Sequence, residues 1–263
     1  MLSRRERPYE NERDKVLRCR LCGTDINIYI FRGDNCNEDL ALDTMRQRKI
    51  KNIDDKLDAF SDIIIERGKS PKGEWRDVFA ASHNSKLYLE IGCGKGMFIN
   101  TSAVSDPQGC YIGAEGLRSV IIRAITAADA AEARNIRFYS GYVNDINSMF
   151  DNGELNGIFL NFSDPWPKAK HAKRRLTCAD RLVQYSYALC SGGFIKFKTD
   201  SDDMFEFTLR QIGQIGSKAG FKISEMTRDL EASEFSAGSP KTEYELKFSA
   251  QGKTINYIAL IRV

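Results

Sequence analysis

A glycine-rich turn follows an apolar stretch near the middle of the chain. Residues 87–96 read LYLEIGCGKG, and Gly92, Gly94 and Gly96 alternate with other residues directly after a predicted strand. Glycines lack the Cβ atoms that hold a backbone away from a ligand, so such a turn can approach a bound molecule closely. The third glycine comes one residue too early for the dinucleotide pattern Gly-x-Gly-x-x-Gly, because Met97 occupies that position. The turn therefore disfavours NAD.

Two acidic residues accompany this turn. Glu90 precedes the first glycine by two residues, and its carboxylate suits a cationic amino-acid group or a sulfonium better than a phosphate. Glu115 follows the next predicted strand, roughly 20 residues after the glycines, where a ribose-binding carboxylate belongs in this architecture. A glycine turn alone is often only a tight connection. Together with the two acids it predicts a nucleoside cofactor bound by Glu90, Gly92, Gly94, Gly96 and Glu115.

A second loop with chemical potential reads NFSDPWPK over residues 161–168. It follows a predicted strand, and open α/β folds bind ligands at the carboxyl ends of their strands. Each proline disfavours helical geometry in the residue before it, so we expect Asp164 and Trp166 to be extended. Asp164 is therefore a candidate catalytic and cofactor-binding residue, and Trp166 offers a large flat face. The alternative interpretation is a rigid structural turn around a buried Trp166.

Five basic residues and one histidine crowd the positions directly after this loop. A charge run of this kind is usually a solvated helix face, but its place beside the presumed site favours contacts with phosphates, which would make affinity fall with salt. We predict RNA contacts at Lys170, His171, Ala172, Lys173, Arg174 and Arg175, next to Lys168. A second basic set is either phosphate-binding or merely solvated, and comprises Arg46, Arg48, Lys49 and Lys51.

The elements that must position these loops alternate between β-rich and amphipathic stretches from residue 86 onward, which predicts an α/β domain with a mainly parallel sheet. Seven strands are expected, at 87–91, 110–114, 136–140, 157–161, 193–198, 221–225 and 256–261. A helix starts near Met97. The apolar stripe of a second helix should face the sheet through Leu117, Val120, Ile121, Ala124, Ile125 and Ala128. Another helix follows Ser201, and residues 229–241 read as a surface loop.

The composition limits the class of protein. With 263 residues, of which 42% are hydrophobic, the chain can bury one sizeable core. No apolar run approaches the roughly 20 residues of a membrane-spanning helix, and the N-terminus lacks the apolar centre of a secretory signal. Seven scattered cysteines, an odd number, indicate a reducing cytoplasm rather than a disulfide framework. The net charge of +3 is too small to identify a polyanionic partner.

Residues 1–44 differ from the rest of the chain and are interpreted as an N-terminal extension, with residues 45–263 as the main domain. The extension is either lineage-specific or the product of a misassigned start. It contains Cys19, Cys22 and Cys36. Zinc normally takes four ligands, and no fourth Cys or His lies nearby, so no metal site is predicted.

Several separated motifs resemble one known family. The segments LEIGCGKG at 89–96, NFSDPWPKAKHAKRR at 161–175, FKTD at 197–200 and TEYELKFSAQG at 242–252 closely resemble the bacterial tRNA (guanine-N7)-methyltransferases of the TrmB type, in the family's order and over residues 45–263. The resemblance implies a Rossmann-like seven-stranded fold with an antiparallel last strand. It also implies S-adenosyl-L-methionine as cofactor, and methylation of the variable-loop guanine at tRNA position 46.

The resemblance also implies roles for individual residues. Glu90, Glu115 and Asp164 match positions that contact S-adenosylmethionine, and Asp164 matches the active-site residue. Contacts with substrate are implied for Lys168, Asp200, Thr242, Glu243, Tyr244 and Glu245. Tyr142 stands where many relatives carry an adenine-binding acid, so a backbone group or Asn144 is expected to serve instead.

Guanine N7 has a lone pair and no proton, so methyl transfer needs alignment more than a general base. We therefore expect Asp164 to act by positioning and electrostatics. Two alternatives remain at this point. A methyltransferase for small molecules or proteins would share the cofactor residues but not explain the basic run, and a noncatalytic RNA-binding subunit would predict a degraded cofactor loop. The protein is expected to be a monomer or a homodimer and no obligate hetero-oligomer.

Overall fold

The computed structural model describes residues 16–18, 25–27, 50–215, 219–237 and 239–263. The chain divides into two compact units, Met1–Arg46 and Gln47–Val263. In the first unit, β1 (Val16–Arg18) and β2 (Asp25–Asn27) pair in antiparallel fashion. The three cysteines of the extension lie outside the described residues, as do Arg46, Arg48 and Lys49 of the second basic set.

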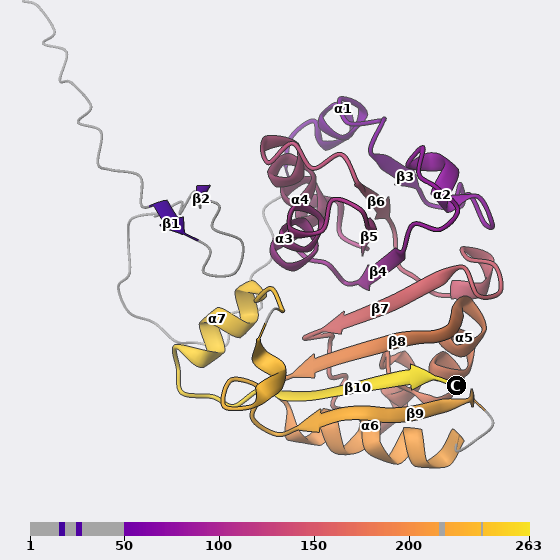
Figure 1. Cartoon of the computed structure of the whole chain (residues 1–263), viewed down its shortest axis with the longest axis vertical. Helices are drawn as coiled ribbons and strands as arrows, with labels where there is room; N and C mark the ends of the chain where they lie inside the picture. Colours follow the sequence, from indigo (N-terminus) through magenta and orange to yellow (C-terminus); the bar gives the residue numbers. More distant parts are fainter. Residues whose placement is uncertain (1–15, 19–24, 28–49, 216–218, 238) are drawn as a thin grey trace, which may run out of the picture. The chain divides into compact units, whose positions relative to one another are not determined.

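The second unit is built on an eight-stranded sheet of order β3-β6-β5-β4-β7-β8-β10-β9 among the described residues. Seven strands run in one direction, and β10 lies antiparallel between β8 and β9, as the opposed arrows in Figure 1 show. The bounds are β3 Ile64–Glu66, β4 Leu87–Ile91, β5 Cys110–Glu115, β6 Ile136–Ser140, β7 Leu155–Asn161, β8 Leu189–Thr199, β9 Phe221–Thr227 and β10 Asn256–Arg262. The predicted mostly parallel sheet with its antiparallel last strand is confirmed. The eighth strand, β3, was not predicted because it is three residues long and only partly buried.

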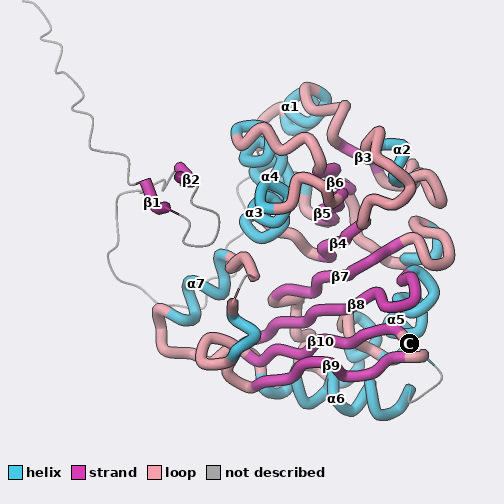
Figure 2. The backbone as a smooth tube through the Cα atoms, in the orientation of Figure 1, coloured by secondary structure: helices cyan, strands magenta, loops and turns pink. Residues whose placement is uncertain are grey.

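Helices cover both faces of this sheet. One apolar cluster packs α3 and α4 against residues such as Tyr111 and Phe138, and another packs α5 and α6 against the opposite face, which includes Leu89 and Ile112. The α-helices are α1 Ile53–Asp58, α2 Trp75–Val78, α3 Met97–Ser105, α4 Arg118–Ala130, α5 Ala179–Ala188, α6 Asp202–Ile215 and α7 Glu243–Ser249. The described residues also include the 3₁₀ turns η1 Ile146–Ser148, η2 Ala169–Arg174 and η4 Glu234–Ser236. Figure 2 shows α7 beyond the ends of the strands rather than on a face of the sheet. No helix of the described residues is long and apolar enough to cross a membrane.

The predicted stripe on α4 is correct only toward the middle of the helix. Ile121, Ala124, Ile125 and Ala128 are buried. Leu117, by contrast, is the N-cap and is 46% exposed, and Val120 is only half-buried. Both line a cavity instead of the core.

Four of the described α-helices were not predicted: the short α1 and α2, and also α5 and α7. In α5 the buried positions Leu182, Tyr185 and Ala188 recur every third residue, a short repeat among polar neighbours. α7 begins with a recognisable N-terminal signal, because Thr242 Oγ1 accepts a hydrogen bond from the Glu245 amide at 2.9 Å. The sequence Thr-x-x-Glu that makes this cap is a capping-box pattern. It was read as a substrate motif and its helix signal was overlooked.

Candidate functional site

A cavity of about 580 Å³ opens at the carboxyl ends of the central strands. It is lined by residues of the glycine turn after β4, by the loops after β5, β6 and β7, and by the start of α7. The structure brings together these sequence-predicted residues: Glu90, Gly92, Gly94, Gly96, Glu115, Asn144, Asp164, Lys173, Arg174, Thr242, Glu243 and Tyr244. The other predicted site residues do not line the cavity: Lys168, Lys170, His171, Ala172, Arg175, Asp200 and Glu245.

The glycine turn needs glycine for both conformation and space. Gly96 has a φ of +85°, and a Cβ atom there would lie 2.7 Å from the Cβ of Ala124 in α4. Glycine therefore allows the turn to press against the neighbouring helix. Glu115 braces the same turn from the adjacent strand. Its carboxylate accepts hydrogen bonds from the Gly94 amide at 3.2 Å and from the Leu117 amide at 2.8 Å.

Glu90 and Asn161 form a buried polar pair at the ends of β4 and β7. Asn161 Nδ2 donates to Glu90 Oε1 at 2.8 Å, and the two residues are 2% and 7% exposed. Burial raises the pKa of Glu90 to about 8, while the Asn161 hydrogen bond and the Lys198 charge oppose that shift. Glu90 Oε2 and Asn161 Oδ1 have no hydrogen-bond partner in the described protein. Two such acceptors beside a cavity call for a donor, and a cation would also favour the ionised carboxylate.

The loop after β7 contains two unusual backbone conformations. Phe162 and Trp166 have φ values of +50° and +41°, which non-glycine residues rarely adopt. The prediction of an extended Trp166 is therefore wrong, because side chains from the following turn hold the loop. The Arg174 Cζ lies 4.9 Å from the centre of the Trp166 ring, and Arg175 donates to the Trp166 carbonyl. Trp166 is half-buried and lines the cavity, while Asp164 beside it is exposed at the rim.

The basic run is split by the structure into two groups. η2 leaves Lys168, Lys170, Lys173 and Arg174 exposed, and of these Lys173 and Arg174 reach the cavity. His171 packs edge-on against the Trp166 ring with 5.6 Å between ring centres. Arg175 is half-buried and directed at the loop. Four of the five positively charged residues are therefore exposed, and Lys168, Lys170, Lys173 and Arg174 are called the basic rim below.

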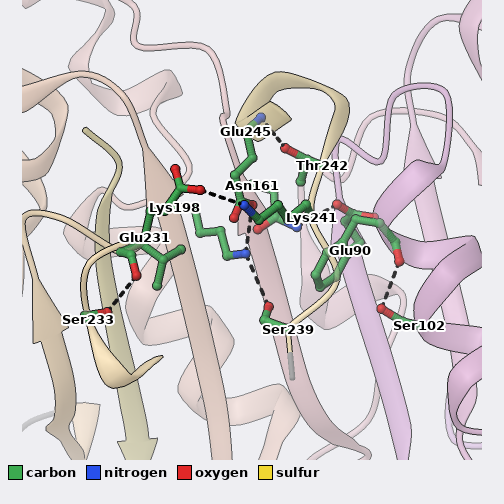
Figure 3. Close-up of polar contacts among 12 residues, drawn as sticks. Glu90, Ser102, Asn161, Lys198, Glu231, Ser233, Ser239, Lys241, Thr242 and Glu245 are labelled. Atoms are coloured by element: carbon green, nitrogen blue, oxygen red, sulfur yellow. Dashed lines mark hydrogen bonds and ion pairs between the residues drawn. The ribbon is translucent and has the colours of Figure 1, made fainter. Parts of the chain in front are cut away.

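Lys198 in β8 is a residue that the sequence interpretation missed, although it lies within the FKTD motif. Its Nζ donates to Glu245 Oε2 at 3.0 Å and to Ser239 Oγ at 3.2 Å, and Figure 3 shows it between these two residues, beside Asn161. The two charged side chains are only 3% and 8% exposed. Glu245 thus attaches α7 to the sheet, and its contact with substrate stays a prediction.

The first residue of α7 reaches the glycine turn. Lys95 Nζ lies 2.8 Å from Glu243 Oε2, so an ion pair joins the two sides of the cavity. Tyr244 is 55% exposed and stacks on Phe162 with 6.1 Å between ring centres. Asp200 lies outside this arrangement, with its carboxylate 3.7 Å from Lys253 Nζ.

The side of the cavity next to β5 and β6 is largely apolar. Tyr142 is 60% exposed, and its ring lies directly over Gly116, where a Cβ atom would be 2.3 Å from it. Leu117, Val120 and the exposed Asn144 share this side. Arg181 was not predicted as a residue of this site, because α5, the helix to which it belongs, was not predicted from the sequence. It donates to the Val143 carbonyl and also lines the cavity.

Comparisons with known proteins agree with this geometry. A family model described as a putative methyltransferase matches residues 84–258. The chain is 38% identical over 218 residues to the tRNA (guanine-N(7)-)-methyltransferase of Lachnoclostridium phytofermentans, covering 83% of this chain and 99% of that protein. It is 38% identical over 211 residues to the enzyme of the same name from Bacillus subtilis, covering 80% and 96%.

A solved structure shows the same fold at lower identity. The structure of an antibiotic-related methyltransferase superposes with a TM-score of 0.51 at 15% identity, covering 72% of this chain and 92% of that one. The Rossmann-like methyltransferase fold is thereby confirmed. The matches over most of the chain show that this protein belongs to the S-adenosylmethionine-dependent tRNA (guanine-N(7)-)-methyltransferase family.

Proposed function

We propose that this protein transfers the methyl group of S-adenosylmethionine to N7 of the variable-loop guanine at position 46 of tRNA, in the cytoplasm. The single observation that carries the proposal is the shared cavity. It joins the partnerless acceptors of Glu90 and Asn161 to Asp164 and to the basic rim at Lys173 and Arg174. Neither a small-molecule enzyme nor a noncatalytic subunit requires this combination.

The residues of the cavity fit the cofactor. When bound, S-adenosylmethionine supplies an electrophilic methyl group on a sulfonium. Glu90 Oε2 and Asn161 Oδ1 are buried acceptors without partners, which suits the ammonium of an amino-acid group. Glu115 already accepts hydrogen bonds from the amides of Gly94 and Leu117, and its remaining lone pairs can receive ribose hydroxyls. Tyr142, Leu117 and Val120 offer an apolar surface for a purine, with Asn144 as the polar group at that side.

Asp164 acts by charge and position. The reacting nitrogen carries no proton, so no residue has to remove one. During transfer, positive charge appears on the guanine ring, and a carboxylate fixed at the rim stabilises it or accepts hydrogen bonds from the N1 and N2 edge. Phe162 and Trp166, two residues before and two residues after Asp164, have left-handed backbone conformations, and such strained residues cluster at sites where preorganisation is part of the mechanism.

The RNA lies on the basic rim in this proposal. Lys168, Lys170, Lys173 and Arg174 contact phosphates, and His171 stays with them through its packing on Trp166. Thr242, Glu243 and Tyr244 line the cavity from α7 and contact the target nucleotide. Asp200 and Glu245 do not line the cavity, and they pair with Lys253 and Lys198 respectively.

Nucleoside analysis of tRNA tests this function. Unmodified tRNA is incubated with the purified protein and labelled cofactor, digested, and examined for 7-methylguanosine. We expect that nucleoside at the variable loop with the parent, and at least a hundredfold less with Asp164→Ala. Asp180→Ala, an exposed aspartate in the first turn of α5 that does not line the cavity, should behave as the parent. Methylation of a protein or metabolite fraction in place of tRNA would overturn the proposal, and full activity in Asp164→Ala would remove Asp164 from its assigned role.

A further inference from the structure

The side chain of Arg175 contacts the loop that carries Asp164. Its Nε donates to the Pro165 carbonyl at 2.9 Å, and its Nη2 donates to the Trp166 carbonyl at 3.0 Å. The guanidinium also lies over the Phe207 ring of α6, with 4.2 Å between Cζ and the ring centre. The side chain thus ties two consecutive carbonyls of the loop to a buried ring of the core.

These two carbonyls belong to the residues directly after Asp164. Trp166 has a φ of +41°, a conformation that costs about 1 to 3 kcal/mol in a non-glycine residue and persists only where the surroundings determine it. A planar guanidinium with two parallel N–H donors can fix the orientation of both peptide groups at once. The Nε and Nη2 edge that could receive a phosphate is therefore occupied by the protein's own backbone.

Arg174, the residue before Arg175, is also an arginine but has different surroundings. Arg174 is exposed and lines the cavity. Its guanidinium stacks over the outer part of the loop at Trp166, and within the described ranges it makes no hydrogen bond or ion pair. Adjacent arginines in the basic run thus have different surroundings: Arg174 is exposed over the Trp166 ring, and Arg175 is hydrogen-bonded to the backbone of the loop.

We propose that Arg175 is a positioning residue for Asp164 and not a phosphate ligand. The inference rests on the proposed function, in which Asp164 is the catalytic residue. Lysine separates the two roles because it carries the same charge as a compact ammonium without a planar fork. A lysine at position 175 therefore preserves a phosphate contact and loses the double hydrogen bond to the loop.

Kinetics and RNA binding of Arg175→Lys and Arg175→Ala test the proposal, with Arg174→Ala as the neighbouring comparison. We expect both Arg175 variants to lower kcat at saturating tRNA and cofactor by about ten- to a hundredfold, the range that a displacement of about 1 Å produces. Their salt dependence of tRNA binding should equal that of the parent. Arg174→Ala should instead lower the slope of log K against log salt by about 1. Parental kcat in Arg175→Lys, together with a reduced salt slope in Arg175→Ala, would overturn the proposal.

Tryptophan fluorescence gives a readout that needs neither tRNA nor activity. The chain has two tryptophans. Trp75 is fully buried, so acrylamide quenching reports on Trp166. Arg175→Lys should increase the quenching constant about twofold or more, and Phe207→Leu, which removes the ring beneath the guanidinium, should change it in the same direction. Circular dichroism identifies the folded variants. Parental quenching in both folded variants overturns the proposal, and this result stands even if the parent fails to methylate tRNA, which would refute only the proposed function.

Discussion

The ammonium of Lys198 lies 3.0 Å from the carboxylate of Glu245, and both side chains are almost fully withdrawn from water. The pair joins β8 to α7, the helix whose first residues line the cavity. Because this ion pair is buried, it fixes the position of α7 relative to the ends of the strands. The residues between Thr242 and Tyr244 therefore depend on a contact that lies outside the cavity itself.

Removing one member of this pair should destabilise the folded protein. Lys198→Met leaves the Glu245 carboxylate buried without a counter-charge, and we expect the free energy of unfolding to fall by about 3 to 5 kcal/mol. The double variant Lys198→Met/Glu245→Leu should recover a large part of that loss. Urea unfolding measures both. The exposed pair Lys69–Glu66 is the control, and Lys69→Met should change stability little because surface pairs contribute little. Equal effects at both sites would contradict a buried anchor.

Glu90 should make the stability of the ligand-free protein depend on pH. Its pKa rises from 4.5 to about 8 on folding because the carboxyl group is buried. Between these values the folded state holds a proton that the unfolded state has lost, so this contribution to stability is present below pH 4.5 and is lost as the pH rises through about 8. Glu90→Gln should flatten that decline in urea unfolding at a series of pH values. The exposed Glu74→Gln should keep the parental profile, and a parental profile in Glu90→Gln would refute the assignment.

Cofactor binding should reverse the protonation of Glu90. S-adenosylhomocysteine carries the same ammonium as the cofactor, and a cation beside Glu90 lowers the pKa of its carboxyl group. At neutral pH binding should therefore release close to one proton, and affinity should increase from about pH 6 to about pH 8. Calorimetry in buffers of different ionisation enthalpy measures the proton. Glu90→Gln should release none, whereas equal release by parent and variant would place the ammonium elsewhere.

The exposed cations of the rim should contribute to tRNA affinity through salt-dependent contacts. Lys173→Ala should lower the slope of log K against log salt by about 1, the expectation for one phosphate contact. Lys222→Ala removes an equally exposed charge from β9, outside the residues that line the cavity, and should leave the slope unchanged. Filter binding or fluorescence anisotropy at several salt concentrations provides the slopes. A parental slope in Lys173→Ala would show that this part of the run is merely solvated.

The main elements could be predicted because their signals are local. The apolar runs at 87–91 and 136–140 coincide with β4 and β6 in full, and the glycine spacing led directly to the turn that lines the cavity. Periodicity identifies an apolar face but not what covers it. For that reason Leu117 and Val120 were assigned to the core although they face the cavity.

Contacts between segments that are separated in the sequence could not be predicted. Proline chemistry predicted an extended Trp166, but Arg175 and Arg174 determine its conformation from the following turn. No sequence pattern reveals that Glu245, whose substrate contact stays a prediction, has Lys198, 47 positions away, as its hydrogen-bond partner. The side-chain roles of Arg175 and Arg174 likewise separate only once Phe207 is placed beneath one of them. The site residues themselves stay predictions until the variants are measured.

The position of β10 between β8 and β9 has a consequence for the order of folding. β9 comes earlier in the chain, yet among the described strands it is hydrogen-bonded only to β10. It can join the sheet only through β10, a later segment that pairs with β8. Such assembly out of chain order requires closure of a long loop, which slows folding. We therefore expect β9 to be the last strand that refolding protects from hydrogen exchange.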